Sequence, residues 1–222
     1  MTAEEYFGEW YKYIPVYEFK ELLTALNRIK AASITPAPGR IFQAFSSTPY
    51  SKCRVVFLGQ DPYPGKGIAT GLCFANNKDT RELSPSLKVL EECCVNYELP
   101  HNHIDFDVTL ESWAEQGVLL LNSALTCEVN KIGSHIMLWR PFISKFLYKL
   151  SRHTPGLIYV LFGKQAQTFK PYINKFDSII EIEHPSFFAR TGNKMPYSLF
   201  KNIDKLTMDK YDFKIKWYNE FK

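Results

Sequence analysis

The sequence predicts an α/β fold: a single domain, residues 1–222, in which helices flank a central four-stranded parallel sheet. Four short apolar runs of strand type alternate with stretches of helical periodicity, which is typical of parallel βαβ units. Three of the runs are almost continuously hydrophobic, as expected for strands that are covered on both faces. The chain shows no repeats, low-complexity tracts or evident linkers, and its length suits one sizeable core.

The N-terminal part is expected to form a helical segment, residues 1–34, that packs on the domain. Residues 3–14 and 17–32 are the predicted helices, and apolar side chains such as Leu22 and Leu26 recur at helical spacing in the second. A turn rich in proline and glycine then leads into the sheet.

The sheet and its covering helices follow in alternation. The predicted strands are residues 54–58, 118–121, 157–162 and 178–182. The predicted helices between them include residues 85–97, 139–151 and 163–171.

Three of these strands lead into residues that can carry chemistry. Asp61 and Tyr63 follow the first strand, Asn122 follows the second and His184 follows the fourth. Ligands of open parallel sheets bind outside the carboxyl ends of the strands. We therefore expect these four side chains to share one crevice although they are distant in sequence.

Each of these residues also has a purely structural explanation. Asp61 precedes a proline in a turn-rich stretch, Asn122 could cap the next element, and His184 could be a hydrogen-bonded histidine at a strand end. Phe74 would by default be a core residue. The joint placement of these residues weakens the structural explanations.

Composition limits the partners only loosely. The net charge of +4 tolerates a polyanion without proving one, so a nucleic-acid face would have to be local. The cysteines are odd in number and lack zinc-ligand spacing, which indicates reduced, mostly buried thiols in an intracellular protein. They are Cys53, Cys73, Cys93, Cys94 and Cys127. The N-terminus is not a targeting peptide and no apolar run has membrane-spanning length, so a soluble, cytoplasmic protein is expected, or a nuclear or host-cell one if its source is eukaryotic or viral.

Several motifs together resemble those of family 1 uracil-DNA glycosylases. Residues 56–65 are similar to the family's water-activating loop, and residues 71–74 to its uracil-stacking segment. The resemblance continues through residues 112–122 and closes with the His-Pro-Ser of residues 184–186. The motifs occur in the family's order and together are highly specific.

This resemblance implies a hydrolase that flips uracil out of DNA and cleaves its N-glycosidic bond without metal or cofactor, leaving an abasic site for base excision repair. Asp61 would position the attacking water and stabilise the cationic sugar, for which its carboxylate must stay ionised. His184, as a neutral imidazole, would donate a hydrogen bond to uracil O2, and the main-chain amide of Gln60 would be a second donor.

The resemblance also assigns the choice of base. Asn122 would accept from N3–H and donate to O4 of uracil, a pattern that cytosine reverses. Tyr63 would exclude the methyl group of thymine, and Phe74 would stack on the flipped ring.

Contacts to DNA are implied for Ser86 and Ser186, which would pinch phosphates around the lesion. The loop after His184 departs from the family, because Phe188 stands where the wedge is normally leucine, and Phe187 is a competing wedge. Pro64 also replaces a usual histidine. The expected partner is uracil-containing single- or double-stranded DNA, with a proteinaceous uracil-DNA glycosylase inhibitor as a further candidate, and the expected state is a monomer.

Three alternatives stay open from the residues. The first is a catalytically weak DNA-binding or polymerase-accessory scaffold on the same fold, which would not need Asp61, Asn122 and His184 together. The second is a glycosylase of mismatch specificity, which the bulk of Tyr63 disfavours. The third is a nuclease suggested by the two histidines of residues 101–103, around which no metal-ligand spacing is evident.

Overall fold

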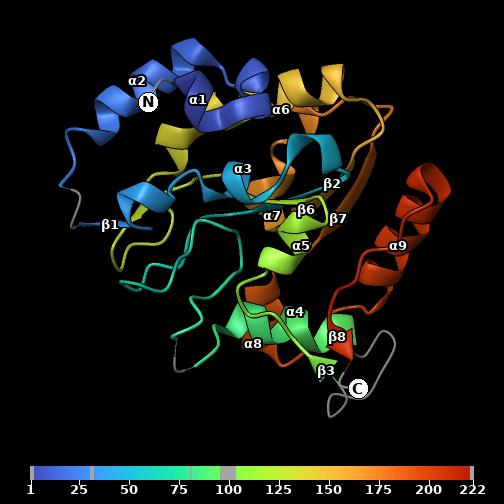
Figure 1. Cartoon of the computed structure of the whole chain (residues 1–222). Coiled ribbons are helices and arrows are strands. Elements are labelled where there is room, and N and C mark those ends of the chain that lie inside the picture. The colour runs from blue at the N-terminus through green and yellow to red at the C-terminus, as the bar shows by residue number, and fades with distance from the viewer. Residues whose placement is uncertain (1–2, 31–32, 81, 96–103, 221–222) are drawn as a thin grey trace.

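The computed structural model describes residues 3–30, 33–80, 82–95 and 104–220 (Figure 1). Its central sheet has four parallel strands in the order β4-β2-β6-β7. They are β4 (Val118–Asn122), β2 (Val55–Gly59), β6 (Ile158–Phe162) and β7 (Ser178–Ile182). The predicted sheet is confirmed, and each strand begins and ends within one residue of its predicted bounds.

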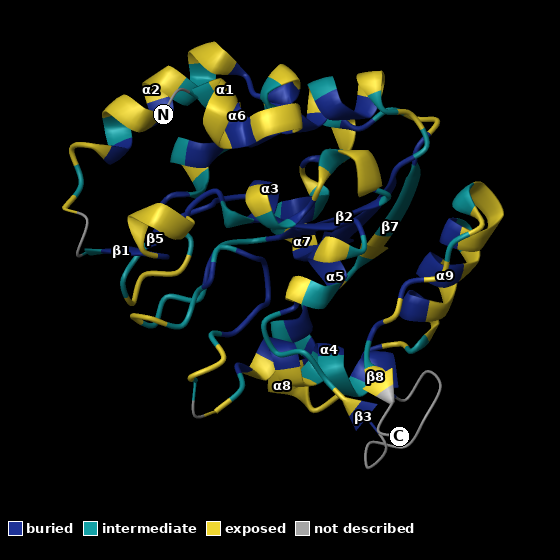
Figure 2. Cartoon of the chain, viewed as in Figure 1, coloured by how far each residue is buried: buried dark blue, intermediate teal, exposed yellow. Residues whose placement is uncertain are grey.

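Burial follows the hydrophobic pattern of the strands (Figure 2). Every residue of β2, β4 and β6 is buried, which explains why these segments are continuously apolar. Strand β7 lies at the edge of the sheet and is only partly buried, consistent with its mixed sequence.

Helices of the N-terminal region and α6 (Ile136–His153) cover one face of the sheet (Figure 1). The N-terminal elements are α1 (Ala3–Phe7), the 3-10 helix η1 (Gly8–Tyr13) and α2 (Val16–Leu26), and α2 packs on α6. The Trp10 indole N–H donates to the Thr48 carbonyl at 2.8 Å. This hydrogen bond joins the N-terminal helical elements to the rest of the protein.

Two predictions for this region were wrong in detail. The helix predicted over residues 3–14 is broken at Gly8, whose φ of +51° lies in the left-handed region, and a 3-10 helix continues from there. The helix predicted over residues 17–32 ends at Leu26, and Arg28 and Ile29 lie in turns.

The other described helices lie nearer the sheet or at the lower and right-hand sides of the view in Figure 1. They are α3 (Gln43–Ser47), α4 (Pro85–Val95), α5 (Glu111–Glu115), α7 (Gly163–Gln167), α8 (Pro185–Thr191) and α9 (Ser198–Tyr211). Helix α4 packs against α8, and α9 packs against β6. The predicted helices did not include α3, α5, α8 or α9.

The intervening helices also differ from prediction at their ends. Helix α6 is longer than the predicted 139–151, whereas α7 stops at Gln167 and is followed by a 3-10 turn. Helix α4 ends at Val95, at the limit of the described residues. The described residues also form short elements: the antiparallel pairs β1 (Ile34–Thr35) with β5 (Cys127–Glu128) and β3 (Ile104–Asp105) with β8 (Asn219–Glu220), and the 3-10 turns η3 (Pro38–Arg40), η4 (Tyr50–Lys52) and η6 (Lys170–Tyr172).

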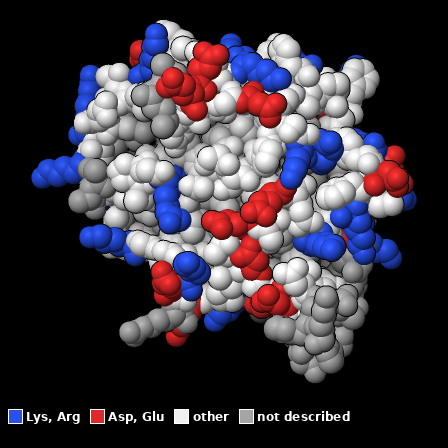
Figure 3. All heavy atoms as spheres, viewed as in Figure 1, with Lys and Arg blue, Asp and Glu red and all other residues white. Residues whose placement is uncertain are grey.

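All five cysteines are free and buried, as predicted. Lys and Arg are interspersed with Asp and Glu over the face shown in Figure 3, in keeping with the small net charge. Within the described ranges, no helix combines the length and the apolar character needed to cross a bilayer. The histidines of residues 101–103, which suggested a nuclease, lie outside the described residues.

Candidate active site

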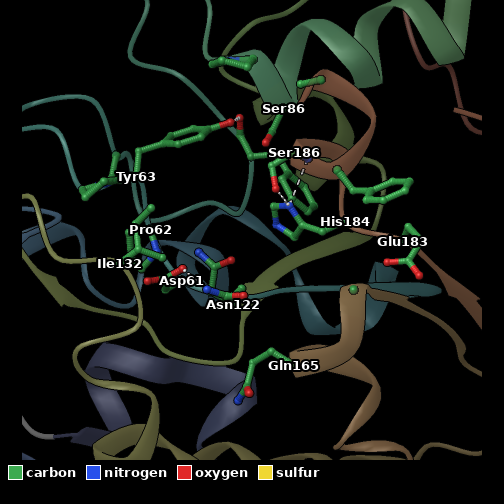
Figure 4. A pocket seen from close by; sticks show the side chains of 18 of the residues that line it. Asp61, Pro62, Tyr63, Ser86, Asn122, Ile132, Gln165, Glu183, His184 and Ser186 are labelled. Carbon is green, nitrogen blue, oxygen red and sulfur yellow. Dashed lines mark hydrogen bonds between the residues drawn. The ribbon is translucent and has the colours of Figure 1, made fainter. Parts of the chain in front are cut away.

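A pocket of about 760 Å³ opens at the carboxyl ends of the strands (Figure 4). This volume lies within the range of small-ligand sites. The pocket contains eight of the nine residues predicted for the site: Gln60, Asp61, Tyr63, Phe74, Ser86, Asn122, His184 and Ser186. The ninth, Phe188, does not line it. The topology of a parallel sheet thus brings together side chains from distant parts of the sequence.

Two glycines allow the pocket walls to approach one another. A Cβ atom on Gly59, at the end of β2, would lie 2.5 Å from Oδ1 of Asn122 and 3.4 Å from the Phe74 ring. A Cβ atom on Gly163 would lie 2.8 Å from Cβ of His184, and its φ of +81° is also left-handed. Larger residues at either position would displace the side chains that form the pocket.

The Asp61 carboxylate is held by two hydrogen bonds. The main-chain N–H of Gly133 donates to Oδ2 at 2.5 Å, and the side-chain amide of Gln60 donates to Oδ1 at 3.1 Å. Burial raises the pKa of Asp61 above its ordinary value. The two donors oppose that rise by stabilising the charged form, and the Gly133 N–H has the larger effect of the two. The carboxylate is therefore fixed in orientation inside a partly dehydrated site.

The His184 imidazole has a defined tautomer. The main-chain N–H of Ser186 donates to Nδ1 at 3.2 Å, and the Ser186 hydroxyl lies 2.9 Å from the same nitrogen. Because Nδ1 accepts, the proton of the neutral ring belongs on Nε2. Burial first, and the positive charge of Arg190 second, lower the pKa of His184 to about 4. At neutral pH the residue is therefore uncharged and carries an N–H donor at Nε2.

Tyr63 and Phe74 support one another. The Tyr63 hydroxyl donates to the Phe74 carbonyl at 2.8 Å. Phe74 has a φ of +67°, uncommon for an aromatic residue, and its ring contacts Phe162 and His184 at centroid distances of 4.9 and 5.5 Å. The Tyr63 bond stabilises a backbone conformation that presents the Phe74 ring to the pocket.

Asn122 ends β4 and is 6% exposed, so its side-chain amide has little freedom to rearrange. An amide offers one acceptor and two donor hydrogens in a fixed plane. The pocket therefore combines a fixed carboxylate, a neutral imidazole N–H and an amide, which can activate water, stabilise a departing anion and recognise a planar polar ring.

The residues assigned to DNA contact divide into two groups. Ser86, near the start of α4, and Ser186, in α8, both line the pocket. Phe188 is 8% exposed and belongs to the hydrophobic core, whereas Phe187 is only partly buried and lines the pocket. The burial of Phe188 does not fit the wedge role predicted for it.

The rim carries charges of both signs. Lys164, Arg190 and Glu183 line the pocket, and Lys164 and Arg190 are exposed. Lys194 lies outside it and pairs with Glu92 at 3.6 Å. Among the described residues, no three His, Cys, Asp or Glu side chains are grouped so as to hold a metal ion.

Two parts of the site that the sequence did not predict are the Gly133 main-chain donor and Ile132. Gly133 contributes a main-chain N–H, which has no side-chain signature in a sequence. Ile132, which precedes it, lines the pocket with 69% of its side chain exposed. An exposed apolar residue at a pocket mouth can be found only once the chain is folded.

The chain is similar in sequence and in fold to known proteins. The model of the uracil DNA glycosylase superfamily matches residues 45–208. A uracil-DNA glycosylase of Aliivibrio salmonicida is 35% identical over 206 residues, covering 90% of each chain. One of Pseudoalteromonas translucida is 40% identical over 148 residues, covering 64% of this chain and 65% of that relative.

Solved structures show the same fold. A mimivirus UNG variant in complex with UGI has a TM-score of 0.75 and 25% identity, covering 92% of this chain and 82% of that one. Mimivirus uracil-DNA glycosylase superimposes with a TM-score of 0.73 at 22% identity, covering 98% and 93% of the two chains.

The fold and the pocket define a class: an α/β protein with acid–base groups in a ligand site at the carboxyl edge of a parallel sheet. Within that class, the chain belongs to the uracil-DNA glycosylase superfamily.

Proposed function

We propose that this chain removes uracil from DNA by hydrolysing the bond between the base and deoxyribose, leaving an abasic site for base excision repair. The observation that carries the proposal is the convergence of Asp61, Asn122 and neutral His184 in one pocket. A DNA-binding scaffold would not need this combination, and the family favours the enzyme.

Cleavage breaks the bond from C1′ of the sugar to N1 of uracil, and the bonding electrons leave with the base. His184 Nε2–H donates to O2 as negative charge develops there, and the main-chain amide of Gln60 adds a second donor. Asp61 faces the cationic sugar and accepts the proton of the water that attacks C1′. A neutral histidine suits this task because its hydrogen bond strengthens as the base becomes an anion.

The choice of base follows from Asn122 and Tyr63. The amide of Asn122 accepts from N3–H and donates to O4, and cytosine would place like groups against it. Tyr63 stands against C5 of the ring, where thymine carries a methyl group, and Phe74 stacks on the flipped base.

Tyr63→Ala is expected to release thymine as well as uracil, because the space taken by the phenol ring then accommodates the methyl group. Thymine release from a thymine-containing oligonucleotide, measured by chromatography, checks this. Tyr63→Phe is the matched control: it removes the bond to the Phe74 carbonyl but keeps the bulk, so it should still reject thymine. Thymine release by both variants, or by neither, would refute the steric account.

Base flipping requires a side chain that fills the space left in the duplex. We propose Phe187 for this role, because it is the aromatic residue of α8 that lines the pocket. Phe188 instead belongs to the hydrophobic core, in a helix that packs on α4. Ser86 and Ser186 are the proposed phosphate contacts, and exposed Lys164 and Arg190 add local positive charge to the rim.

Phe187→Ala is expected to slow excision from duplex DNA more than from single strands, in which less stacking must be broken. Phe188→Ala should instead lower the free energy of unfolding by about 3 kcal/mol and leave the duplex-to-single-strand ratio unchanged. Rates on both substrates, with thermal melts, separate the two. If the duplex-to-single-strand ratio of excision rates changes in Phe188→Ala and not in Phe187→Ala, Phe188 and not Phe187 is the wedge residue.

The partners proposed with this function are uracil-containing DNA, single- or double-stranded, and a proteinaceous uracil-DNA glycosylase inhibitor. A mimivirus relative of similar fold was solved in complex with UGI, which supports the second.

We also propose that the chain acts as a monomer with a single domain and works in the cytoplasm.

The proposal is tested on an end-labelled oligonucleotide with one uracil, single- and double-stranded, incubated with chelator and then treated with alkali. Cleavage only at uracil and only after alkali is the expected result. Folded protein that leaves both substrates intact would favour the scaffold.

A further inference from the structure

The bond between Gly133 and Asp61 joins two segments that lie far apart in the sequence. The Gly133 N–H donates to Oδ2 of Asp61 at 2.5 Å, and the Gly133 carbonyl in turn accepts from the Ile136 N–H at 3.2 Å, at the start of α6. The position of this donor therefore depends on residues 127–135, which we call the 127–135 segment.

Further contacts bind the 127–135 segment to the loop that carries Asp61. The Cys127 thiol lies 3.5 Å from the Pro62 carbonyl, and the Asn130 N–H donates to the Pro64 carbonyl at 3.0 Å. Two neighbouring loops thus share contacts along residues 61–64. A shift of one loop would be transmitted to the other.

The buried hydroxyl of Thr126 links the start of the 127–135 segment to its end. The Trp139 indole N–H donates to Oγ1 of Thr126 at 2.7 Å, and the same oxygen lies 2.9 Å from Nδ1 of His135. Thr126 and Trp139 are fully buried and His135 is 6% exposed. Thr126 precedes the segment, His135 ends it and Trp139 lies in α6, so one hydroxyl joins both ends of the segment to the helix.

We propose that Thr126 is a positioning residue for the reaction: its hydroxyl fixes the 127–135 segment so that the Gly133 N–H holds the Asp61 carboxylate ionised and correctly oriented. This inference rests on the proposed function of Asp61. It assigns a task in the reaction to a buried hydroxyl that does not line the pocket.

The proposal has a consequence for pH dependence. Burial raises the pKa of Asp61 and the Gly133 donor opposes the rise, so loss of that donor raises the pKa further. Activity requires the ionised carboxylate, so the rate falls as the pH drops through this pKa, and in a variant without the bond the fall begins at higher pH.

The other titratable groups around Asp61 are separable from this effect. The Cys127 thiol, whose pKa burial raises to about 12, and the Tyr63 phenol, whose pKa burial raises, stay neutral across the acid range. His184 lines the same pocket with a pKa of about 4.

The 127–135 segment also carries His135, whose pKa burial lowers, and the exposed pair of Glu128 and Lys131 at 2.5 Å. On the rim, Glu183 opposes the two cations Lys164 and Arg190.

The test compares Thr126→Val with Thr126→Ser in single-turnover excision from a single-stranded oligonucleotide with one uracil, across pH 4 to 8. Valine keeps the shape of threonine but cannot bond either ring, whereas serine keeps the hydroxyl. We expect Thr126→Val to lose about tenfold in rate at neutral pH and to move the acid limb of its profile upward by about one pH unit. Thr126→Ser should restore the wild-type acid limb.

Ser151→Ala is the control for a general loss of stability. It removes another fully buried hydroxyl, that of Ser151 in α6, which donates to Asp177 at 2.7 Å and lies far along the helix from the pocket. Its acid limb should match wild type even if its melting temperature falls. An unshifted acid limb in folded Thr126→Val, or equal shifts in Thr126→Val and Ser151→Ala, would overturn the proposal. Because the wild-type protein is assayed alongside, its failure to excise uracil would instead count against the proposed function.

Discussion

Asp61→Asn is expected to lower the rate of uracil excision about a thousand-fold or more while leaving binding of uracil-containing DNA largely intact. In the proposed mechanism, the change removes both the negative charge that would face the cationic sugar and the acceptor for the water proton. It also leaves one of the two donors, Gly133 N–H or the Gln60 amide, facing an N–H instead of an oxygen. Single-turnover rates and binding titrations on the same oligonucleotide measure the two effects.

Asp177→Asn is the matched control for this variant. Asp177 is a buried carboxylate that, like Asp61, accepts two hydrogen bonds, here from the Ser151 hydroxyl and the Gly156 N–H, both at 2.7 Å, but it does not line the pocket. The control should lose stability and keep its rate per folded molecule. Near-normal turnover by Asp61→Asn would show that the Asp61 carboxylate is not needed for the reaction.

Asn122→Asp is expected to gain excision of cytosine and to lose about a hundred-fold or more on uracil. A buried carboxyl group that is protonated can donate to N3 of cytosine and accept from its N4 amino group, whereas the ionised form repels O4 of uracil. Alkali-labile sites at cytosines in a labelled strand report the gain.

Asn174→Asp makes the same substitution outside the pocket, where Asn174 accepts from the Phe176 N–H. This control should act on uracil alone, at the wild-type rate. If Asn122→Asp releases no cytosine while still binding DNA, recognition of the base does not depend on the amide of Asn122.

The parallel sheet and most of the pocket could be predicted because both depend on short-range signals. The continuous apolar runs of β2, β4 and β6 reflect complete burial, and the residues after each strand fall at one edge of the sheet by topology. The motif resemblance supplied the roles of Asp61 and His184, and the structure adds the Nδ1 contact of Ser186 that sets the imidazole tautomer.

The parts that were missed depend on contacts between distant segments. The main-chain donor of Gly133 has no side-chain pattern, so no sequence signal could have placed it on Asp61. The order of Phe187 and Phe188 was read by counting from His184, but the packing of α8 on α4 decides which ring is buried. The N-terminal helix was predicted too long because the positive φ of Gly8 is a property of the folded backbone.

The most direct test of the account is mass spectrometry of the products formed from an oligonucleotide with a single uracil. The account predicts free uracil and an unbroken strand that has lost the base and gained a hydroxyl group, with both products formed about a thousand-fold more slowly, or slower still, by Asp61→Asn. A strand of unchanged mass after incubation with folded wild-type protein, or a strand broken without alkali, would contradict it.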